Sequence, residues 1–401
     1  MKKNGYRGSS VDCPKCGRAA AYHGDRERNP LGLGGAIRCK RAYYYCRKCG
    51  EGTVPWDQTT GLTDRNFTPA LEQLACLTGA VADSFAKGAD LLEKTASVRL
   101  SESTIQRTTE DAGARIAEAM KEGKTFGPKV HWNWNHDARG RRVAYVGLDA
   151  TGVPQQGEHG EKAEGRMAYV GIVYNPLPDR ERVFTNLPKA GEQMKARYVS
   201  SVCTMAEMGP LMRKQGGQVG MNDADVWIAL TDGGNGLEHF METYFPRVEA
   251  VILDFWHASE YVAKLAQALH ADDAKALEQT QQWKHILKDE GGWTLLAIWE
   301  TWNWPEGKAS LRAVLDDVLC YFRNQAHRME YPEYEANGWY IGSGAVESAC
   351  KTVVNQRLKG AGMRWSEEGA NVVCHVRALY QSEPGQWESF WQRDTQFRTV
   401  V

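Results

Sequence analysis

The chain has 401 residues, of which 42% are hydrophobic, and its 49 Lys and Arg against 50 Asp and Glu leave a formal net charge of −1. This length and apolar content suffice for a sizeable core and for two or three domains. No apolar run reaches the about 18 residues of a transmembrane helix, and the N-terminus lacks the apolar region of a signal peptide. We therefore expect a cytoplasmic, reducing setting, in which the 10 cysteines are metal ligands or core residues rather than disulfides.

The charges are unevenly distributed along the chain. Residues 1–50 contain 12 Lys and Arg against three Asp and Glu, and residues 351–364 contain four basic residues and no acid. Two basic segments on a neutral chain suggest contact with a polyanion at two places, and a merely solvated surface is the alternative.

Two C-x-x-C pairs, each followed by glycine, lie in the first 50 residues: Cys13, Cys16, Cys46 and Cys49. Each such turn can present two thiolates to one Zn²⁺, which prefers four tetrahedral ligands. The segment AIRCKRAYYYC between the pairs is predicted to form a hairpin. Residues 1–60 are therefore predicted to be a zinc ribbon with one structural Zn²⁺, because neither pair has a thioredoxin-like context. Cys39 and His23 are expected to be packing or surface residues.

Residues 65–125 are predicted to be helical, in the segments TPALEQLACLTGAVA, SFAKGADLLEKTA and STIQRTTEDAGARIAEAMKEG. The third segment opens with Ser103 and Gln106 at the spacing of a capping box. Short helices of this kind can form a DNA-binding helix-turn-helix or a small helical bundle, and the sequence leaves both open. Residues 124–142 are polar and aromatic and are predicted to be a linker or loop.

From residue 143 the pattern is that of strands. RVAYVGLDATG and RMAYVGIVYN predict two strands around a polar loop, RVFTNL (182–187) is a candidate third strand, and a helical stretch is expected from there to about Lys214. DVWIALTDGGNGL and VEAVILDFWHASEYVAKLAQAL each predict a strand and a following helix. Residues 271–336 are predicted to be helical, and GSGAVESACKTVVNQRLKG (342–360) is predicted to be a helix opened by glycines. These elements predict a multidomain α/β protein with a mixed sheet.

Four acidic residues have similar places in these elements. Asp149, Asp232 and Asp254 each end a predicted strand, and Glu347 lies near the start of the last helix. Carboxylates from neighbouring strand ends and a facing helix can converge, and two Mg²⁺ (or Mn²⁺) ions about 3.5–4 Å apart need such oxygen ligands. Singly, each acid is more often a turn cap, and spacing alone does not decide between Asp232 and Asp254. The ribonuclease H-like fold has this layout: an Asp on the first strand of a meander, an Asp after the fourth strand and a Glu on a late helix.

These stretches resemble the DDE transposases of bacterial insertion sequences, most closely those of the ISKra type. The matching segments are VGLDATGVP, LTDGGNGL, ILDFWHASEYV and GSGAVESACKTVVNQRLKGAGMRWSEEGANVV, and the resemblance covers residues 13–380. It implies that the DDE triad, which holds two Mg²⁺ ions, is Asp149, Asp232 and Glu347. Asp254 and His257 then resemble the motif that follows the second catalytic Asp, and they are expected to support the site.

The resemblance also implies double-stranded DNA as the partner, both element ends and target, bound by a nucleoid-associated homodimer. Four basic side chains are expected to contact DNA phosphates: Lys351, Arg357, Lys359 and Arg364. Lys351 lies one helical turn after Glu347, where pairing with that glutamate is the alternative. Trp365 is a candidate for stacking on an unpaired base, with a core position as the alternative.

The expected organisation has five parts: a zinc ribbon (1–60), a helical DNA-binding region (65–125), the first part of a ribonuclease H-like catalytic domain (140–270), a helical insertion (271–336) and the final part of the catalytic domain with the Glu-bearing helix (337–385). The expected function is that of a transposase, which cleaves one DNA strand at the end of a mobile element and joins the freed 3′-OH to target DNA. A stand-alone ribonuclease H-like nuclease or resolvase, and a non-catalytic DNA-binding relic, are the alternatives.

Overall fold

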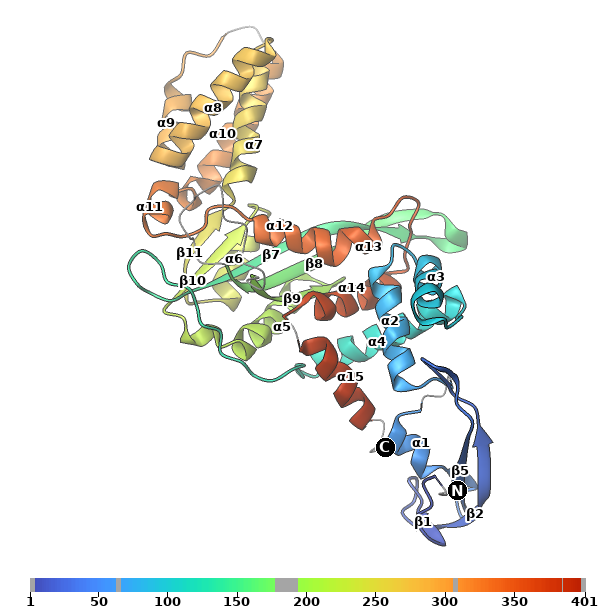
Figure 1. Ribbon diagram of the computed structural model, residues 1–401. Coiled ribbons are helices and arrows are strands. Elements are labelled where there is room, and N and C mark those ends of the chain that lie inside the picture. The colour runs from blue at the N-terminus through green and yellow to red at the C-terminus, as the bar shows by residue number, and fades with distance from the viewer. Residues whose placement is uncertain (1–3, 63–65, 177–193, 306–308, 384, 398–401) are drawn as a thin grey trace.

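The computed structural model describes residues 4–62, 66–176, 194–305, 309–383 and 385–397 (Figure 1). A mixed sheet with helices on both faces forms the centre, a small β unit lies at one end, and a helical group projects at the other. The predicted mixed α/β fold is therefore confirmed. No helix in the described part of the chain combines the length and apolar character that a membrane crossing requires.

The N-terminal unit is a four-stranded antiparallel sheet in the order β1-β2-β5-β6, followed by one short helix. Its elements are β1 (Ser10–Asp12), β2 (Ala19–Arg28), β3 (Leu31–Gly32), β4 (Gly35–Ala36), β5 (Cys39–Cys46), β6 (Glu51–Thr53) and α1 (Pro55–Thr60). The segment 36–46, predicted to form a hairpin by itself, instead supplies the single strand β5, which pairs with β2; β3 and β4 lie at the tip of that pair. The core of this unit is small, because its cluster of buried side chains contains only Cys13, Ala20, Ala42, Tyr44 and Cys46.

Three helices come next in the chain, each with a side-chain cap at its start: α2 (Pro69–Val81), α3 (Phe85–Ala96) and α4 (Glu102–Lys121). The sequence placed the start of the third helix two residues too late. Ser101 caps it instead, and its Oγ accepts a hydrogen bond from the backbone N–H of Thr104 at 3.2 Å. Gln106 therefore caps nothing and donates to Glu110 at 2.9 Å.

The three helices pack on one another and on α14 (Glu367–Gln381), beside the sheet (Figure 1). On the exposed face of α3, Lys87 and Lys94 are paired with Asp83 and Asp90. The packing is that of a small helical bundle, and its use as a DNA-binding unit stays a prediction.

The central sheet has the strand order β11-β10-β7-β8-β9. Its strands are β7 (Val143–Gln156), β8 (Lys162–Asn175), β9 (Lys195–Ser201), β10 (Val226–Thr231) and β11 (Val248–Leu253). The first three form an antiparallel meander, and β10 and β11 run parallel to β7. Short 3-10 turns lie at Glu158–Gly160 and Met221–Asp223.

The sheet is apolar on both faces, and alternate residues of a strand enter different cores. Val143 and Tyr145 of β7 face a core shared with α7 (Phe255–Leu269) and α12 (Gly344–Ala349). Ala144, Val146 and Leu148 face a second core shared with α5 (Met205–Gln218) and α6 (Leu237–Tyr244). Asp149 lies an even number of residues after Val143 and Tyr145, so it shares their face of the sheet, which α12 covers.

The third strand differs from the prediction. The candidate strand 182–187 lies outside the described residues, and the observed third strand, β9, occupies a stretch that was expected to be helical. Pairing with β8, from Tyr169↔Ser201 to Asn175↔Lys195, decides the conformation of this segment. Helix α5 begins at Met205, where Thr204 and Glu207 form a capping box.

The described residues between 271 and 336 form helices and no strand, as the sequence predicts: α8 (Asp273–Glu290), α9 (Gly292–Thr301), α10 (Ala309–Gln325), a 3-10 turn (Ala326–Arg328) and α11 (Tyr331–Ala336). Together with α7 they project from the sheet (Figure 1). Trp283 packs edge-on against Trp299 and Trp302, which explains the many tryptophans of this segment. The chain then returns through α12, a π-helical segment (Cys350–Asn355), α13 (Gln356–Leu358) and α14, and ends in α15 (Gln386–Phe397).

Candidate functional site

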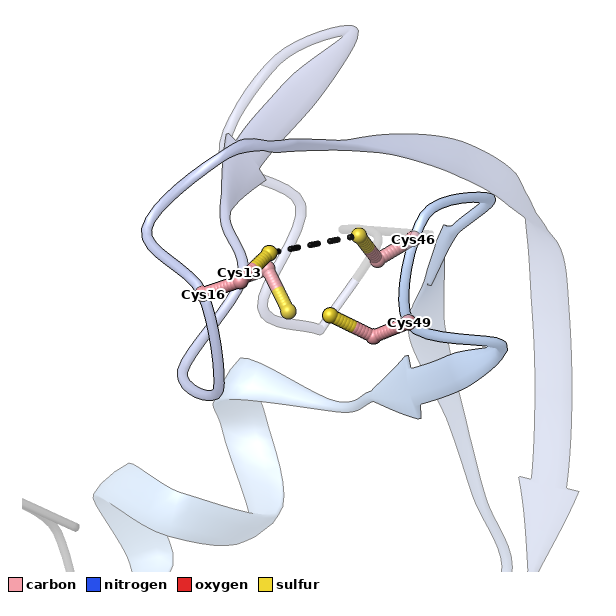
Figure 2. A group of neighbouring side chains, drawn as sticks. All are labelled: Cys13, Cys16, Cys46 and Cys49. Carbon is pink, nitrogen blue, oxygen red and sulfur yellow. Dashed lines mark hydrogen bonds between the residues drawn. The ribbon is translucent and has the colours of Figure 1, made fainter.

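Four cysteine side chains from two turns of the N-terminal unit point toward one another (Figure 2). All four Sγ atoms lie within 4.8 Å of one another, and Sγ of Cys16 is 3.8 Å from Sγ of Cys46. A tetrahedral Zn²⁺ with bonds of about 2.3 Å requires sulfur atoms about 3.8 Å apart. The cluster could therefore bind one structural zinc ion through all four thiolates.

The two turns have the same shape. The backbone N–H of Gly17 donates to the carbonyl of Cys13 at 2.9 Å, and that of Gly50 donates to the carbonyl of Cys46 at 2.9 Å. Both glycines have φ of +69°, in the left-handed region that glycine adopts without strain. The glycine after each C-x-x-C pair thus closes the turn that directs two sulfur atoms inward.

The cysteines share hydrogen bonds in this cluster. A backbone N–H bond from Arg18 and the thiols of the other cysteines lower the pKa of Cys16 to about 7. The pKa of Cys49 rises to about 12, mainly because its thiol donates to Cys16. The pKa of Cys16 thus lies below that of an ordinary thiol, which is the direction that binding of its thiolate to a metal ion requires.

Cys39 and His23 stay outside this cluster, as the sequence predicts. Cys39 is buried, and its thiol donates to the carbonyl of Arg28 at 3.2 Å. His23 is exposed on β2, between the rings of Tyr43 and Tyr45.

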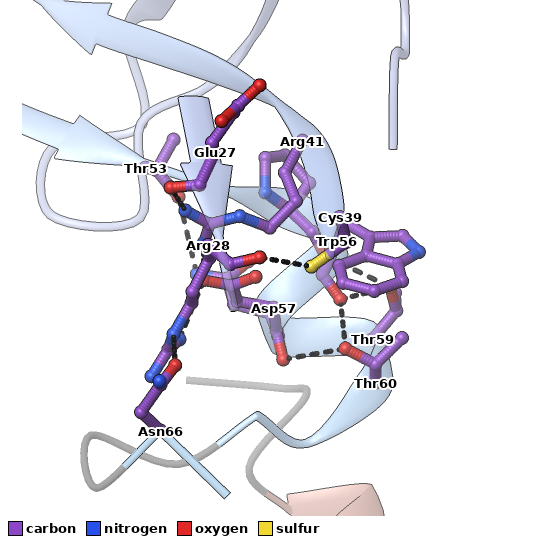
Figure 3. Close-up of polar contacts among 12 residues, drawn as sticks. Glu27, Arg28, Cys39, Arg41, Thr53, Trp56, Asp57, Thr59, Thr60 and Asn66 are labelled. Carbon is purple, nitrogen blue, oxygen red and sulfur yellow. Dashed lines mark hydrogen bonds and ion pairs between the residues drawn. The ribbon is translucent and has the colours of Figure 1, made fainter. Parts of the chain in front are cut away.

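A partly buried ion-pair network joins the strands of the N-terminal unit to helix α1 and to the segment before α2 (Figure 3). Asp57 of α1 accepts from Arg28 at 3.0 Å and also from Arg41, while Arg28 donates to Asn66 at 2.7 Å. Arg41 is buried. Two of the basic residues that the sequence assigns to a positive segment therefore have a structural role.

Asp149 lies inside β7 and does not end a strand, which corrects the sequence prediction. The parallel pairing with β10 stops at Gly147↔Leu230, and β7 continues as far as Gln156 paired only with β8. Gly147 is the last residue of β7 that pairs with β10, and Asp149 is the next residue on the same face of β7. It is partly buried at the edge where β10 ends.

The surroundings of Asp149 include other candidate groups. Burial raises the pKa of its carboxyl group, while the thiol of Cys350, the N–H of Ala150 (2.6 Å) and the nearby His257 favour the charged form. The charge of Asp232 raises the pKa of Asp149 further, so the two carboxylates are close enough to interact.

Asp232 follows β10 directly, as predicted, and its Oδ1 accepts from the N–H of Gly234 at 2.9 Å. Glu347 is exposed on α12, and its Oε1 accepts from the hydroxyl of Ser343 at 3.3 Å. The neighbouring Val346 packs on Gly147 of β7, two residues before Asp149.

Among the three predicted acids, Asp149, Asp232 and Glu347, the first two interact at one edge of the sheet, and the helix that carries the third packs on the same face of β7 through Val346. Their spacing is looser than that of the cysteines. Within the described ranges, the four cysteines alone have ligand atoms within 4.8 Å of one another.

Asp254 caps helix α7. It is 1% exposed; its Oδ1 accepts from the N–H groups of Trp256 (3.2 Å) and Ser343 (3.0 Å), and its Oδ2 accepts from that of His257 (3.3 Å). Both carboxylate oxygens are therefore engaged by backbone donors, as in a structural cap. The cap also ties α7 to the turn before Glu347. The ring of His257 lies 3.7 Å from Glu260.

Three of the predicted DNA-contacting side chains are exposed: Lys351, Lys359 and Arg364. The ammonium group of Lys359 donates to the hydroxyl of Thr151 at 3.0 Å, two residues after Asp149 on β7. Arg364 donates to the carbonyl of Gly160 in the turn between β7 and β8 at 2.6 Å. Lys359 therefore lies on the same face of β7 as Asp149.

Arg357 and Trp365 are buried, which corrects the expectation that Arg357 contacts DNA phosphates and agrees with the core position, rather than base stacking, for Trp365. Arg357 is 1% exposed, donates to the carbonyl of Gly79 at 3.0 Å, and lies over the rings of Phe85 (4.4 Å) and Trp365 (5.0 Å). Trp365 is 7% exposed and donates to the carbonyl of Leu358 at 3.1 Å. Both connect α13 to the three-helix bundle.

Sequence reasoning missed Cys350 and Ser343, which touch two of the candidate acids. Their closeness to Glu347 in the chain was the available signal, but neither residue type predicts such a contact. The comparisons with known proteins return no match: no protein-family model fits the chain, and no curated protein is significantly similar to it.

Proposed function

We propose that the chain is a DNA transposase whose central sheet is a ribonuclease H-like catalytic domain with residues 271–336 as a helical insertion. The observation that supports this proposal is the pair of interacting carboxylates at one edge of the sheet, Asp149 on β7 and Asp232 after β10, beside which the Glu347-bearing helix α12 packs on β7. The resemblance of the surrounding segments to ISKra-type transposases supports it. A meander flanked by two parallel strands agrees with the proposed fold.

The donor set of this edge fits divalent metal ions, because hard cations prefer carboxylate oxygens. Asp149, Asp232 and Glu347 would hold two Mg²⁺ or Mn²⁺ ions, which supply charge stabilisation to the attacking and leaving oxygens of a phosphodiester. Lys351 and Lys359, exposed on the same segment as Glu347, would bind DNA phosphates and fix the strand over this edge. Water would attack first, and the freed 3′-OH would then attack target DNA. The zinc ribbon and the three-helix bundle would bind the element ends as a homodimer.

Cleavage and joining assays test this proposal. Purified protein is incubated with Mg²⁺, a labelled DNA carrying the repeats that flank the gene, and a supercoiled target. We expect 3′-end cleavage and joined products, and Asp149→Asn, Asp232→Asn and Glu347→Gln should each lower both by about 100-fold or more. Cleavage without joining would instead identify a nuclease or resolvase. DNA binding with no metal-dependent cleavage would identify a relic and contradict the proposal.

A further inference from the structure

Three consecutive tyrosines of β5 divide between the two faces of the N-terminal sheet. Tyr44 is buried in the small core of this unit, on the same face as Cys46. Tyr43 and Tyr45 point to the opposite face, where both stay half-buried and are partly open to solvent. Two aromatic rings therefore lie on a face that the core of this unit does not use.

Strand β2 adds two exposed side chains to the same face, His23 and Arg26. The ring centroid of His23 lies 6.1 Å from that of Tyr43 and 6.0 Å from that of Tyr45. The guanidinium group of Arg26 lies 4.8 Å over the ring of Tyr43. A shift in the pairing with β5, between Tyr22 and Asp25, lets both residues share this face although they are three apart in the chain. We call these four side chains, His23, Arg26, Tyr43 and Tyr45, the tyrosine face.

Strand β6 completes the tyrosine face without covering it. Gly52 pairs with Tyr45, and a Cβ added at this glycine would collide with the hydroxyl and ring of Tyr43. The ring of Tyr43 therefore lies against the backbone of β6, and only glycine leaves room for it there.

The charges of this sheet are separated by face. The acids of β2 and β6 lie on the face opposite the tyrosines: Asp25, Glu27 and Glu51. Their partners on β5 are even-numbered residues from Lys40 to Cys46, which point away from Tyr43 and Tyr45. On the tyrosine side, Asp12 belongs to β1, which β2 separates from β5. Two further cations, Arg47 and Lys48, are exposed in the turn after β5. Rings with neighbouring cations and distant acids complement a polyanion.

We propose that the tyrosine face binds single-stranded DNA. The rings of Tyr43 and Tyr45 stack on unpaired bases, and Arg26 with the cations of the following turn binds the phosphates. Aromatic rings accept bases of any sequence because every base has a π-face, whereas a duplex keeps its bases stacked on one another. The choice of DNA rests on the proposed function, in which this unit binds the element ends.

Binding of a fluorescent thymidine strand of about 12 nucleotides to the full chain, measured by anisotropy without Mg²⁺, tests the proposal. We expect this strand to bind more tightly than a duplex of the same length, and about fivefold or more tightly than a strand with abasic sites. Tyr43→Leu and Tyr45→Leu should each weaken binding about fivefold or more. Tyr43→Phe and Tyr45→Phe keep the ring and should stay within about twofold of wild type. Tighter binding of the duplex, or of an RNA strand of the same sequence, would overturn the proposal.

Tyr6→Leu is the matched control. Tyr6 is 46% exposed, and its ring lies 5.1 Å from that of Tyr22, which packs on Tyr44 and hydrogen-bonds Asp25 on the opposite face. The control should bind DNA as wild type does. Zinc content and melting curves show that each variant keeps its fold. Folded Leu variants of Tyr43 and Tyr45 with wild-type affinity, or an equal loss in Tyr6→Leu, would refute the stacking role.

Photocross-linking of the wild type needs no substitution and separates this proposal from the proposed function. A strand with 5-iodouracil should cross-link to Tyr43 or Tyr45, because light couples this base to an aromatic ring stacked on it. If these cross-links form but the protein cleaves no DNA with Mg²⁺, the transposase proposal fails and the tyrosine face is supported. If the protein cleaves DNA and cross-links only at other residues, the tyrosine face alone is refuted.

Discussion

The hydrogen-bond partners of individual side chains separate acids that look alike in the sequence. Asp254 gives both oxygens to backbone donors, whereas Asp232 and Glu347 each have one oxygen engaged by a near neighbour in the chain. Asp149 accepts a hydrogen bond from the backbone N–H of Ala150. An acid whose oxygens are saturated by the backbone stabilises the fold, and one with free lone pairs can bind an ion.

The cap role of Asp254 predicts a loss of stability when it is replaced. Asp254→Ala leaves three backbone N–H groups without their acceptor and should lower the free energy of unfolding by about 1–2 kcal/mol or more. Asp254→Asn keeps one acceptor oxygen and should lose less. Urea unfolding measures this, with cleavage assayed on the folded protein. A stably folded Asp254→Asn without any cleavage would mean that Asp254, and not Asp232, is the ligand.

His375 predicts a pH dependence of stability. It is buried on α14 with its Nδ1 unpaired, and burial lowers its pKa from 6.5 to about 4. A lowered folded-state pKa means that its contribution is fully present above pH 6.5 and is lost as the pH falls through about 4. Relative to His375→Leu, the wild type should lose about 3 kcal/mol between pH 7 and pH 4. Urea midpoints of both proteins across this range measure the difference, and parallel curves would contradict a buried neutral histidine.

At the scale of elements, the N-terminal unit has too few apolar residues to fold on packing alone. Its buried cluster has five side chains, and two of them are cysteines of the candidate zinc site. Small units of this kind usually need a metal or a disulfide. The zinc ion would therefore be part of the core of this unit.

Zinc content is accordingly expected to be about one ion per chain. Cys13→Ser/Cys46→Ser should abolish it and expose residues 1–60 to protease, while the rest of the chain keeps its melting transition. Cys39→Ser is the control, because this buried cysteine lies outside the cluster. Metal analysis of fresh, reduced protein measures the stoichiometry; zinc near zero in wild type, or equal loss in the control, would rule out the four-cysteine site.

At the scale of the whole molecule, burial decides which charges can meet a polyanion. The segment 351–364 has four basic residues, of which Arg357 is enclosed between aromatic rings and the other three are exposed. Lys359 contacts Thr151, two residues after Asp149 on β7, and the sheet lies between the N-terminal unit at one end of the molecule and the helical projection at the other (Figure 1). A bound DNA would therefore have its phosphates near the acids.

The salt dependence of DNA binding tests this surface. Lys351→Ala, Lys359→Ala and Arg364→Ala should each reduce the slope of log affinity against log salt by about 0.9, because each removes one phosphate contact. Arg357→Met is the matched control; it should lower the melting temperature and leave the slope unchanged. An unchanged slope in all three exposed variants, or a reduced one in Arg357→Met, would contradict the assignment.

The sequence by itself determined the features that depend on neighbours in the chain. The C-x-x-C-G turns, the hydrophobic runs of β7, β8, β10 and β11, and the acid after β10 arise from local patterns, because a turn or strand forms its characteristic hydrogen bonds with nearby or regularly spaced residues. The pairing of β9, the continuation of β7 past Asp149 and the burial of Arg357 were decided only by the tertiary structure. Each depends on a partner far away in the chain: β8 for β9, the end of β10 for Asp149, and Phe85 for Arg357. A single sequence carries no local signal for such partners, since burial and strand ends are set by the elements that pack against a residue.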